Sequence, residues 1–314
     1  MRIVILTISD KHNDKYDNSK VVKEGGYCIA GFEVGHPDSW IRLLGKHDHY
    51  KITNEEAVYD NGVMCQPLDI IEVEAYPVDQ NFIYVCRSSW RPKGNVYDIF
   101  ANYPESLLSV QPENYYVIGK FQYIDHMSME ELLSEYYEES GGRLFGSSSN
   151  WLTVRQAEEN KKSLQMIKVS NLELYPIEQR YGKDEYSSHY RARFDYNGFT
   201  YENITVTDPE YAADLNDYMN LSFGDTYLVV SLGERYYGKH YKLIAKIFDV
   251  VYTIENNFLK YFHAFRDCVY LQRYNNITRD LYQTMIKKGM KPCQECNNRI
   301  GVDRDGFMFD LPFQ

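Results

Sequence analysis

Residues 225–248 constrain the fold most, because two β-favouring runs surround a glycine-containing turn between Gly233 and Gly238. Paired runs of this kind are typical of a β-hairpin. The turn also carries several aromatic rings and cations. Rings and cations at the tip of a strand pair suit a β-barrel that grips a flat or phosphorylated ligand. The stretch therefore predicts a β-rich binding protein without identifying its ligand.

A second hairpin is predicted by Asn197-Gly198, which separates the runs 189–196 and 199–206. Asn-Gly between alternating runs is the strongest short hairpin signal. The other β-favouring runs are closely spaced and separated by Gly, Pro and Asn turns, as is typical of a small barrel or sandwich. These runs are residues 2–8, 27–34, 39–44, 68–78, 164–169 and 172–177, with weaker candidates at 82–86 and 115–118.

Helical patterns occur in few places. Ser128 can cap a helix over 128–139, and Asp208-Pro209 can open a short helix that ends near residue 219. Beyond residue 254 the apolar period becomes helical. The residues of this C-terminal pattern are Phe258, Phe262, Phe265 and Val269 on one face, then Leu281, Tyr282, Met285 and Ile286 with Thr278 as the cap.

We therefore expect a mainly β (α+β) chain with two OB-like β-barrel modules followed by a C-terminal helical segment. A length of 314 residues is comfortable for two domains. The expected domains are an N-terminal OB-like β domain with a helical insertion at 1–160, a second OB-like barrel at 161–253, and a helical tail with a Cys-x-x-Cys motif at 254–314.

The composition bears on the binding surface. The chain has 30 Tyr, and aromatic residues make up 15% of it, which favours an extended, half-exposed binding surface. The net charge of −11 argues against a nucleic-acid binder that uses its whole surface, but it permits a local basic groove. Residues 256–299 carry a net positive charge, opposite to that of the whole chain, because they hold eight basic residues and three acidic ones.

The cellular setting follows from what the sequence lacks. Six irregularly spaced Cys do not make a disulfide framework. The opening Met-Arg-Ile-Val-Ile-Leu-Thr is too short an apolar run for a signal peptide. No stretch approaches the ~18 apolar residues of a membrane span. We expect a cytoplasmic protein with no membrane contact.

Several short motifs, taken in order, resemble the dual OB-containing domain family. The resemblance covers roughly residues 1–250 and departs from the family in a charged insertion at about 11–24 and in the tail from 254. It implies a protein of bacterial conflict and anti-phage loci that senses or binds nucleic acid without catalysis. The motifs are Ile3-Val-Ile-Leu, Gly25-Gly-Tyr-Cys-Ile-Ala-Gly31, Trp40-Ile-Arg42, Pro67-Leu-Asp-Ile-Ile-Glu-Val73, residues 201–211, residues 230–234 and residues 240–245.

Three groups of residues are candidates for nucleic-acid contact, with rings that stack on bases and cations that pair with phosphates. Trp40 and Arg42 lie two apart and therefore share one face of a strand. Each group has an alternative. Trp40 can belong to the core beside an Arg42 that pairs with a carboxylate, residues 87–93 can form an ordinary exposed loop, and residues 235–242 can form a solvated turn. The candidates are Trp40 and Arg42; Arg87, Trp90, Arg91 and Lys93; and Arg235, Tyr236, Tyr237, Lys239, His240 and Lys242.

Cys293 and Cys296 have the spacing of a zinc knuckle and are candidate ligands of a structural zinc. His263 and Cys268 are available, but there is no second close pair of cysteines. The alternative is two reduced thiols in a loop after a helix. No other cofactor is expected.

The common catalytic signatures are missing: a phosphate-binding Gly-rich loop, His-Glu-x-x-His and Gly-x-Ser-x-Gly. Asp69, Glu72 and Glu74, or Asp208 and Glu210, could hold a metal for nuclease chemistry, but neither set has the accompanying Lys.

We therefore expect a non-enzymatic protein that binds or senses nucleic acid. DNA, RNA and nucleotide all remain open as the ligand. The rival function is an interaction scaffold whose C-terminal helices dock a defence effector such as an ATPase or nuclease, and the negative net charge favours this rival.

Overall fold

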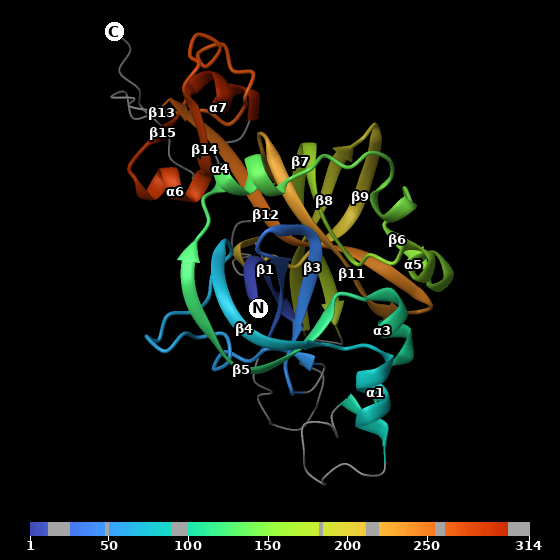
Figure 1. Cartoon of the computed structure of the whole chain (residues 1–314). Coiled ribbons are helices and arrows are strands. Elements are labelled where there is room, and N and C mark those ends of the chain that lie inside the picture. The colour runs from blue at the N-terminus through green and yellow to red at the C-terminus, as the bar shows by residue number, and fades with distance from the viewer. Residues whose placement is uncertain are drawn as a thin grey trace.

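The computed structural model describes residues 1–11, 26–47, 50–88, 100–181, 185–211, 220–254 and 261–300. The chain is mainly β, as expected. Two five-stranded barrels pack directly against each other, and a small C-terminal unit lies beside the long strand β12 (Figure 1). None of the described helices is both long enough and apolar enough to cross a membrane.

The first barrel is closed, with the strand order β1-β2-β3-β5-β4 and back to β1. Strands β3 and β5 are parallel, and the other neighbours are antiparallel. This is the strand order of an OB barrel. Its interior is filled by aliphatic side chains and Phe121. The strands are β1 (Arg2–Lys11), β2 (Gly26–Glu33), β3 (His36–Leu44), β4 (Asp69–Pro77) and β5 (Asn114–His126).

The second barrel repeats this order. Its ring is β7-β8-β9-β12-β11 and back to β7, and again only the third and fifth strands, β9 and β12, are parallel. Two short strands, β6 (Trp151–Thr153) and β10 (Leu221–Ser222), pair with its rim. The main strands are β7 (Leu164–Tyr181), β8 (Glu185–Tyr196), β9 (Phe199–Val206), β11 (Thr226–Tyr236) and β12 (Lys239–Ile254).

Both predicted hairpins are present. Asn197 and Gly198 have φ values of 49° and 76°, and Tyr237 and Gly238 have φ values of 46° and 75°. Positive φ at both central residues is the requirement of a two-residue type I′ turn. The second turn is shorter than the predicted span from Gly233, because β11 continues to Tyr236 and β12 begins at Lys239.

An apolar layer joins the barrels. Val4, Leu6 and Phe32 on the outside of the first barrel pack with Tyr227 and Phe248 on the outside of the second. A buried hydrogen bond from Thr7 Oγ1 to the Ala245 carbonyl, 2.8 Å long, crosses the same joint. Much of the outer face of β1 and β2 is therefore covered by the second barrel.

Helices fill the connections. Residues 82–86 are not a strand but part of helix α1 (Gln80–Arg87), which Asp79 caps by accepting from the Phe82 amide. Only Ile83 and Cys86 of this β-favouring run are buried, at helical spacing. The remaining described connections include α3 (Glu105–Val110), α4 (Met129–Glu131) with its Ser128 cap as predicted, a π-helical turn Leu132–Tyr136, and α5 (Val154–Asn160). The predicted helix over 208–219 is a 3-10 turn at Pro209–Tyr211, and its remainder lies outside the described residues.

The C-terminal unit is less helical than predicted. Phe262 lies in β13 (Tyr261–Phe262) and the following residues form turns, so the expected helical face through Phe265 and Val269 is wrong. Thr278 lies in β14 (Ile277–Leu281), where its hydroxyl contacts Thr253, and it does not cap a helix. The described helices here are α6 (Tyr282–Lys287) and α7 (Gln294–Ile300), on either side of β15 (Lys291–Pro292).

Candidate nucleic-acid interface

Trp40 lies on the outer face of the first barrel. In β3, Ile41 and Leu43 point into the barrel core, so Trp40 and Arg42 point outward. The outer face of the second and third strands is where OB barrels bind oligonucleotides. Most of this face is covered by the second barrel, but a pocket remains open at Trp40.

The pocket is lined by aromatic rings. Buried Phe32 packs edge-on against Trp40, with centroids 6.4 Å apart, and stacks on Tyr136 at 5.1 Å. Trp40 and Tyr136 are both half-buried and both line the cavity, which has a volume of about 280 Å³. A nucleobase-sized ligand that enters this cavity would meet the faces or edges of several rings.

The first barrel and the segment between the two barrels contribute charge to the pocket. Arg143 and Lys162 are exposed cations on its lining, and Asp38 and Glu138 are exposed carboxylates. The Arg143 guanidinium also lies 4.9 Å from the centre of the Phe199 ring. The charges of these four side chains balance, so the pocket is locally neutral within a chain of net charge −11.

The hairpin tip is the connection between the fourth and fifth strands of the second barrel, which is an oligonucleotide-binding loop of OB barrels. Tyr236 and Tyr237 are 63% and 85% exposed and pack edge-to-face with centroids 4.5 Å apart. Arg235 is exposed beside them. Lys239 instead holds its ammonium 3.8 Å from the centre of the Trp151 ring. The tip thus presents two tyrosines and an arginine to solvent.

Arg87 lies in the equivalent connection of the first barrel. It is exposed, and its guanidinium donates to the carbonyls of Ala101 and Tyr103 at 3.0 and 2.9 Å. Trp90, Arg91 and Lys93 belong to the same connection but lie outside the described residues. This connection contacts the second barrel, because Gln111 donates to the carbonyl of Leu232 in β11 at 3.0 Å.

Comparison with protein families agrees with this duplicated architecture. The family model of the dual OB-containing domain matches residues 18–83 and 92–247. The chain belongs to the dual OB-containing domain family. Comparison with curated proteins and with solved structures gives no significant match. The family match stops before the C-terminal unit.

Three predicted contact residues of this dual OB chain are corrected by their burial. Arg42 is 5% exposed and donates to Ser163 Oγ at 3.1 Å, while Ser163 in turn contacts Glu113. His240 is fully buried, with Nδ1 2.9 Å from the Gly233 carbonyl. These side chains hold the two barrels and the hairpin together, and they do not reach a ligand at the surface.

Lys242 is the third correction. It is 1% exposed and donates to the Ser147 carbonyl at 2.6 Å. Its ammonium also lies 4.7 Å from the centre of the Tyr201 ring. Burial lowers the pKa of Lys242 to about 7, since removing an ammonium from water disfavours its charged form.

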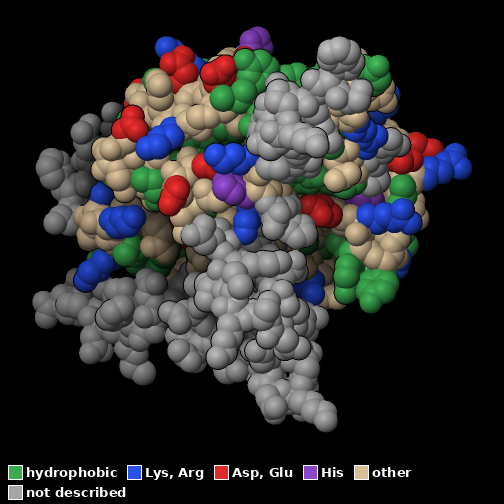
Figure 2. All heavy atoms as spheres, turned by 90° about the horizontal axis from the view of Figure 1, so that it is seen from below, with side chains coloured by type: hydrophobic (Ala, Val, Ile, Leu, Met, Phe, Trp, Pro, Cys, Tyr) green, Lys and Arg blue, Asp and Glu red, His purple; other side chains and the backbone are tan. Residues whose placement is uncertain are grey.

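Charge on the lower face of the dual OB pair is mixed. Figure 2 shows this face from below, and its described Lys and Arg side chains are interspersed with Asp and Glu. No continuous basic field forms on the described part of this face. Binding that depended on a long phosphate track would require such a field.

Each predicted carboxylate set has one buried member, which makes contacts within its own barrel. Asp69 is buried, accepts from Tyr59 OH at 2.7 Å and lies 3.0 Å from His126 Nδ1. Asp208 is also buried, and Lys246 Nζ lies 3.2 Å from it and 2.8 Å from Glu210. An ammonium thus sits between the second pair of carboxylates, where a catalytic metal would have to bind.

Cys293 and Cys296 lie in the C-terminal unit together with His263 and Cys268. His263 and Cys268, with four residues between them, are the second pair of this group. A search for two close cysteines misses this pair, because one member is a histidine.

Phe32, Tyr136, Arg143 and Lys162 were also missed as pocket residues. They come from separate segments, and no sequence signal brings them together.

Proposed function

We propose that this dual OB protein binds single-stranded nucleic acid without catalysing a reaction on it, and that one base enters the pocket at Trp40. The observation that carries the proposal is the aromatic pocket on the strand 2–3 face of the first barrel. Stacking on Trp40 and Tyr136 would hold the base. Arg143 and Lys162 would pair with the adjoining phosphates.

The pocket's size favours a single unstacked base. A volume of about 280 Å³ is just below the usual range of small-molecule sites, roughly 300–1,000 Å³. A base inside a duplex is stacked and paired, so it cannot enter a pocket without being extruded. Bases of single strands are splayed out at much lower cost.

The rest of the bound nucleic acid would continue along β3 toward two loops, the β4–β5 connection of the first barrel and the β11–β12 connection of the second barrel. Trp40 and Leu44 are separated by about 13 Å along β3, at 3.3 Å per residue. Leu44 packs with Ile83 of α1, which begins the loop of the first barrel. Arg235, Tyr236 and Tyr237 provide a second stacking point on the loop of the second barrel.

Several features support a binding role over an enzymatic one. Asp69 and Asp208 are buried in internal contacts, and Lys246 occupies the space between Asp208 and Glu210. A role in anti-phage defence, which the family resemblance implies, is part of the same proposal. A protein partner at the C-terminal unit is compatible with it, because the pocket lies on the barrels.

Fluorescence anisotropy with labelled single- and double-stranded DNA and RNA tests the proposal. Trp40→Leu and Tyr136→Leu should each weaken single-strand binding at least about fivefold, since a base–aromatic stack contributes about 1–3 kcal/mol. Tyr270→Leu is the matched control, because Tyr270 is 56% exposed but lies in the C-terminal unit. Equal binding by all three variants would contradict the proposed pocket.

Salt dependence tests the phosphate contacts separately. Two neutralised phosphates predict a slope of about −1.4 in log K against log salt for a single strand, or about sevenfold between 50 and 200 mM. Arg143→Ala should halve this slope. Arg155→Ala is the control, because Arg155 is exposed and pairs with Glu159 of the same helix at 2.8 Å. Failure of every probe to bind at 50 mM salt would favour the scaffold function.

A further inference from the structure

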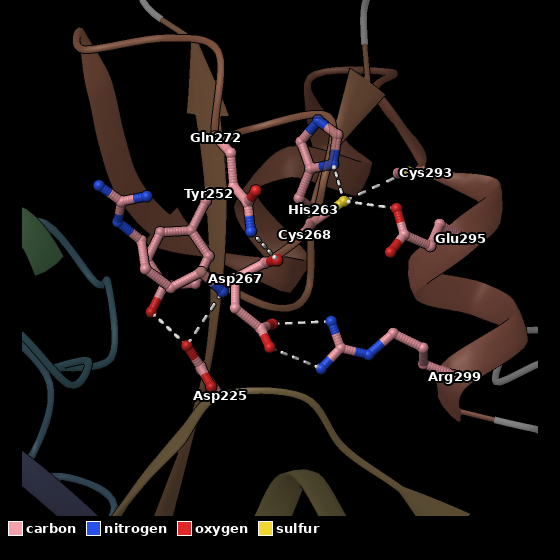
Figure 3. Close-up of polar contacts among 10 residues, drawn as sticks. Asp225, Tyr252, His263, Asp267, Cys268, Gln272, Cys293, Glu295 and Arg299 are labelled. Atoms are coloured by element: carbon pink, nitrogen blue, oxygen red, sulfur yellow. Dashed lines mark hydrogen bonds and ion pairs between the residues drawn. The ribbon is translucent and has the colours of Figure 1, made fainter.

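Four metal-binding side chains gather in the C-terminal unit, beyond the family match. His263, Cys268, Cys293 and Cys296 place their ligand atoms within 4.8 Å of one another. All four are buried, the most exposed being Cys293 at 6%. Among the described residues no other group of three or more His, Cys, Asp and Glu is close enough to share an ion. In Figure 3, dashed lines join the Cys268 sulfur to His263 and to Cys293.

The distances fit tetrahedral coordination. With zinc–sulfur bonds of 2.3 Å, two sulfurs of a tetrahedron lie about 3.8 Å apart, and Cys268 Sγ and Cys293 Sγ lie 3.9 Å apart. The His263 Nδ1 to Cys268 Sγ distance is 3.2 Å. A disulfide requires about 2.05 Å between sulfurs, so Cys268 and Cys293 are not bonded to each other.

The backbone fixes the ligand positions. The pairing of Phe262 with Pro292 in β13 and β15 brings the next residues, His263 and Cys293, side by side. The Cys293 amide donates to the Phe262 carbonyl at 2.8 Å. Cys296 then follows in the first turn of α7. The cluster thus consists of two short segments, His263-x4-Cys268 and Cys293-x2-Cys296, held together by a strand pair.

A carboxylate contacts the cluster from outside without being one of its four members. Glu295, 3.3 Å from the Cys268 sulfur, lies outside the group of four.

We infer that His263, Cys268, Cys293 and Cys296 bind one Zn²⁺ as a structural site. Three thiols and one imidazole are a common zinc ligand set, and four protein ligands leave no position open for catalysis. The ion would complete a unit whose own core is small, because among its described residues the buried apolar side chains other than cysteine are Phe262, Ala264, Leu271 and Met285. Domains with so little core usually need a metal or disulfides.

The bound zinc would also fix this unit to the second barrel. His263 exchanges two backbone hydrogen bonds of 2.8 Å with Tyr252 of β12. The Asp225 amide donates to the Ala264 carbonyl at 2.9 Å. The Arg266 amide and the Tyr252 hydroxyl both donate to the Asp225 carboxylate, at 3.2 and 2.6 Å (Figure 3). The residues of the C-terminal unit that make these contacts are either a zinc ligand or lie within three positions of one. Zinc binding would therefore hold the surface that contacts the barrel.

Elemental analysis of the full chain, purified without metal-chelating resin, tests the inference. We expect one zinc per chain, and Cys268→Ser and Cys293→Ser should lose it. Cys86→Ser is the matched control, because Cys86 is equally buried but belongs to α1. Glu295→Gln should also retain the zinc. Zinc retained by Cys293→Ser, or lost from Glu295→Gln alone, would overturn the ligand assignment.

A cobalt titration of the parent chain tests the site without using variants, which can fail to fold. The parent chain, stripped with a chelator and titrated with Co²⁺, should develop the strong visible absorption of tetrahedral cobalt with thiolate ligands, and this should saturate at one equivalent. Added Zn²⁺ should remove the absorption. A chain isolated without zinc whose cobalt spectrum stays weak, as for an octahedral aqua ion, would contradict the site.

Discussion

At the residue scale, exposure separates the proposed contact residues from structural ones, and the sequence alone does not determine which side chains are exposed. Tyr236 and Tyr237 were expected at a surface and lie there. Arg42 and Lys242 carry the same kind of charge as Arg235 but are buried. A cation in a β-favouring run can point to either side of a strand. Which side is covered depends on how the second barrel packs, and this is a long-range property.

Lys242 should give the protein a characteristic pH dependence. Its pKa falls from 10.5 to about 7 on folding, so between these values the unfolded chain binds more protons than the folded chain. Stability therefore rises with pH across this window. Lys242→Met should remove that contribution. Urea unfolding at pH 7, 8, 9 and 10 measures it as a difference between parent and variant that grows with pH, and a constant difference would contradict it.

At the element scale, the hairpins and the helix α6 were predictable, and the other C-terminal elements were not. Asn197-Gly198 and the run to Val206 contain a complete local signal, and β9 ends at the predicted residue. Residues 82–86 favour a strand by composition, but the Asp79 cap makes them a helix. The C-terminal unit misled the sequence analysis, because Phe262, Phe265 and Val269 have a helical period but lie in a short strand and turns beside His263 and Cys268.

Gly31 tests the register of the first barrel. A Cβ at Gly31 would lie 1.8 Å from the Val4 carbonyl oxygen, next to the irregularity between β1 and β2. Gly31→Ala should therefore lower the free energy of unfolding by about 3 kcal/mol or more, the upper range for overpacking. Gly141→Ala, where no atom lies within 4 Å, should change it by less than about 0.5 kcal/mol. Equal values from urea unfolding would contradict the β1–β2 register.

At the scale of the whole molecule, the second barrel delimits the proposed binding pocket of the first. It covers Ala30 and Phe32 on the face that OB barrels use for binding and leaves a pocket around Trp40. The duplicated strand order could be inferred from the sequence through its family resemblance. The pocket could not, because Tyr136, Arg143 and Lys162 reach it only when the two barrels are packed together.

Trp40 fluorescence tests the central claim most directly. The chain has three Trp, so Trp90→Phe with Trp151→Phe leaves Trp40 as the only indole. Titration of this variant with an unlabelled single-stranded oligonucleotide should quench its emission saturably, with the midpoint found by anisotropy, because a base stacks against the ring. Saturable anisotropy without any change in Trp40 emission would show that nucleic acid binds elsewhere and would contradict the account.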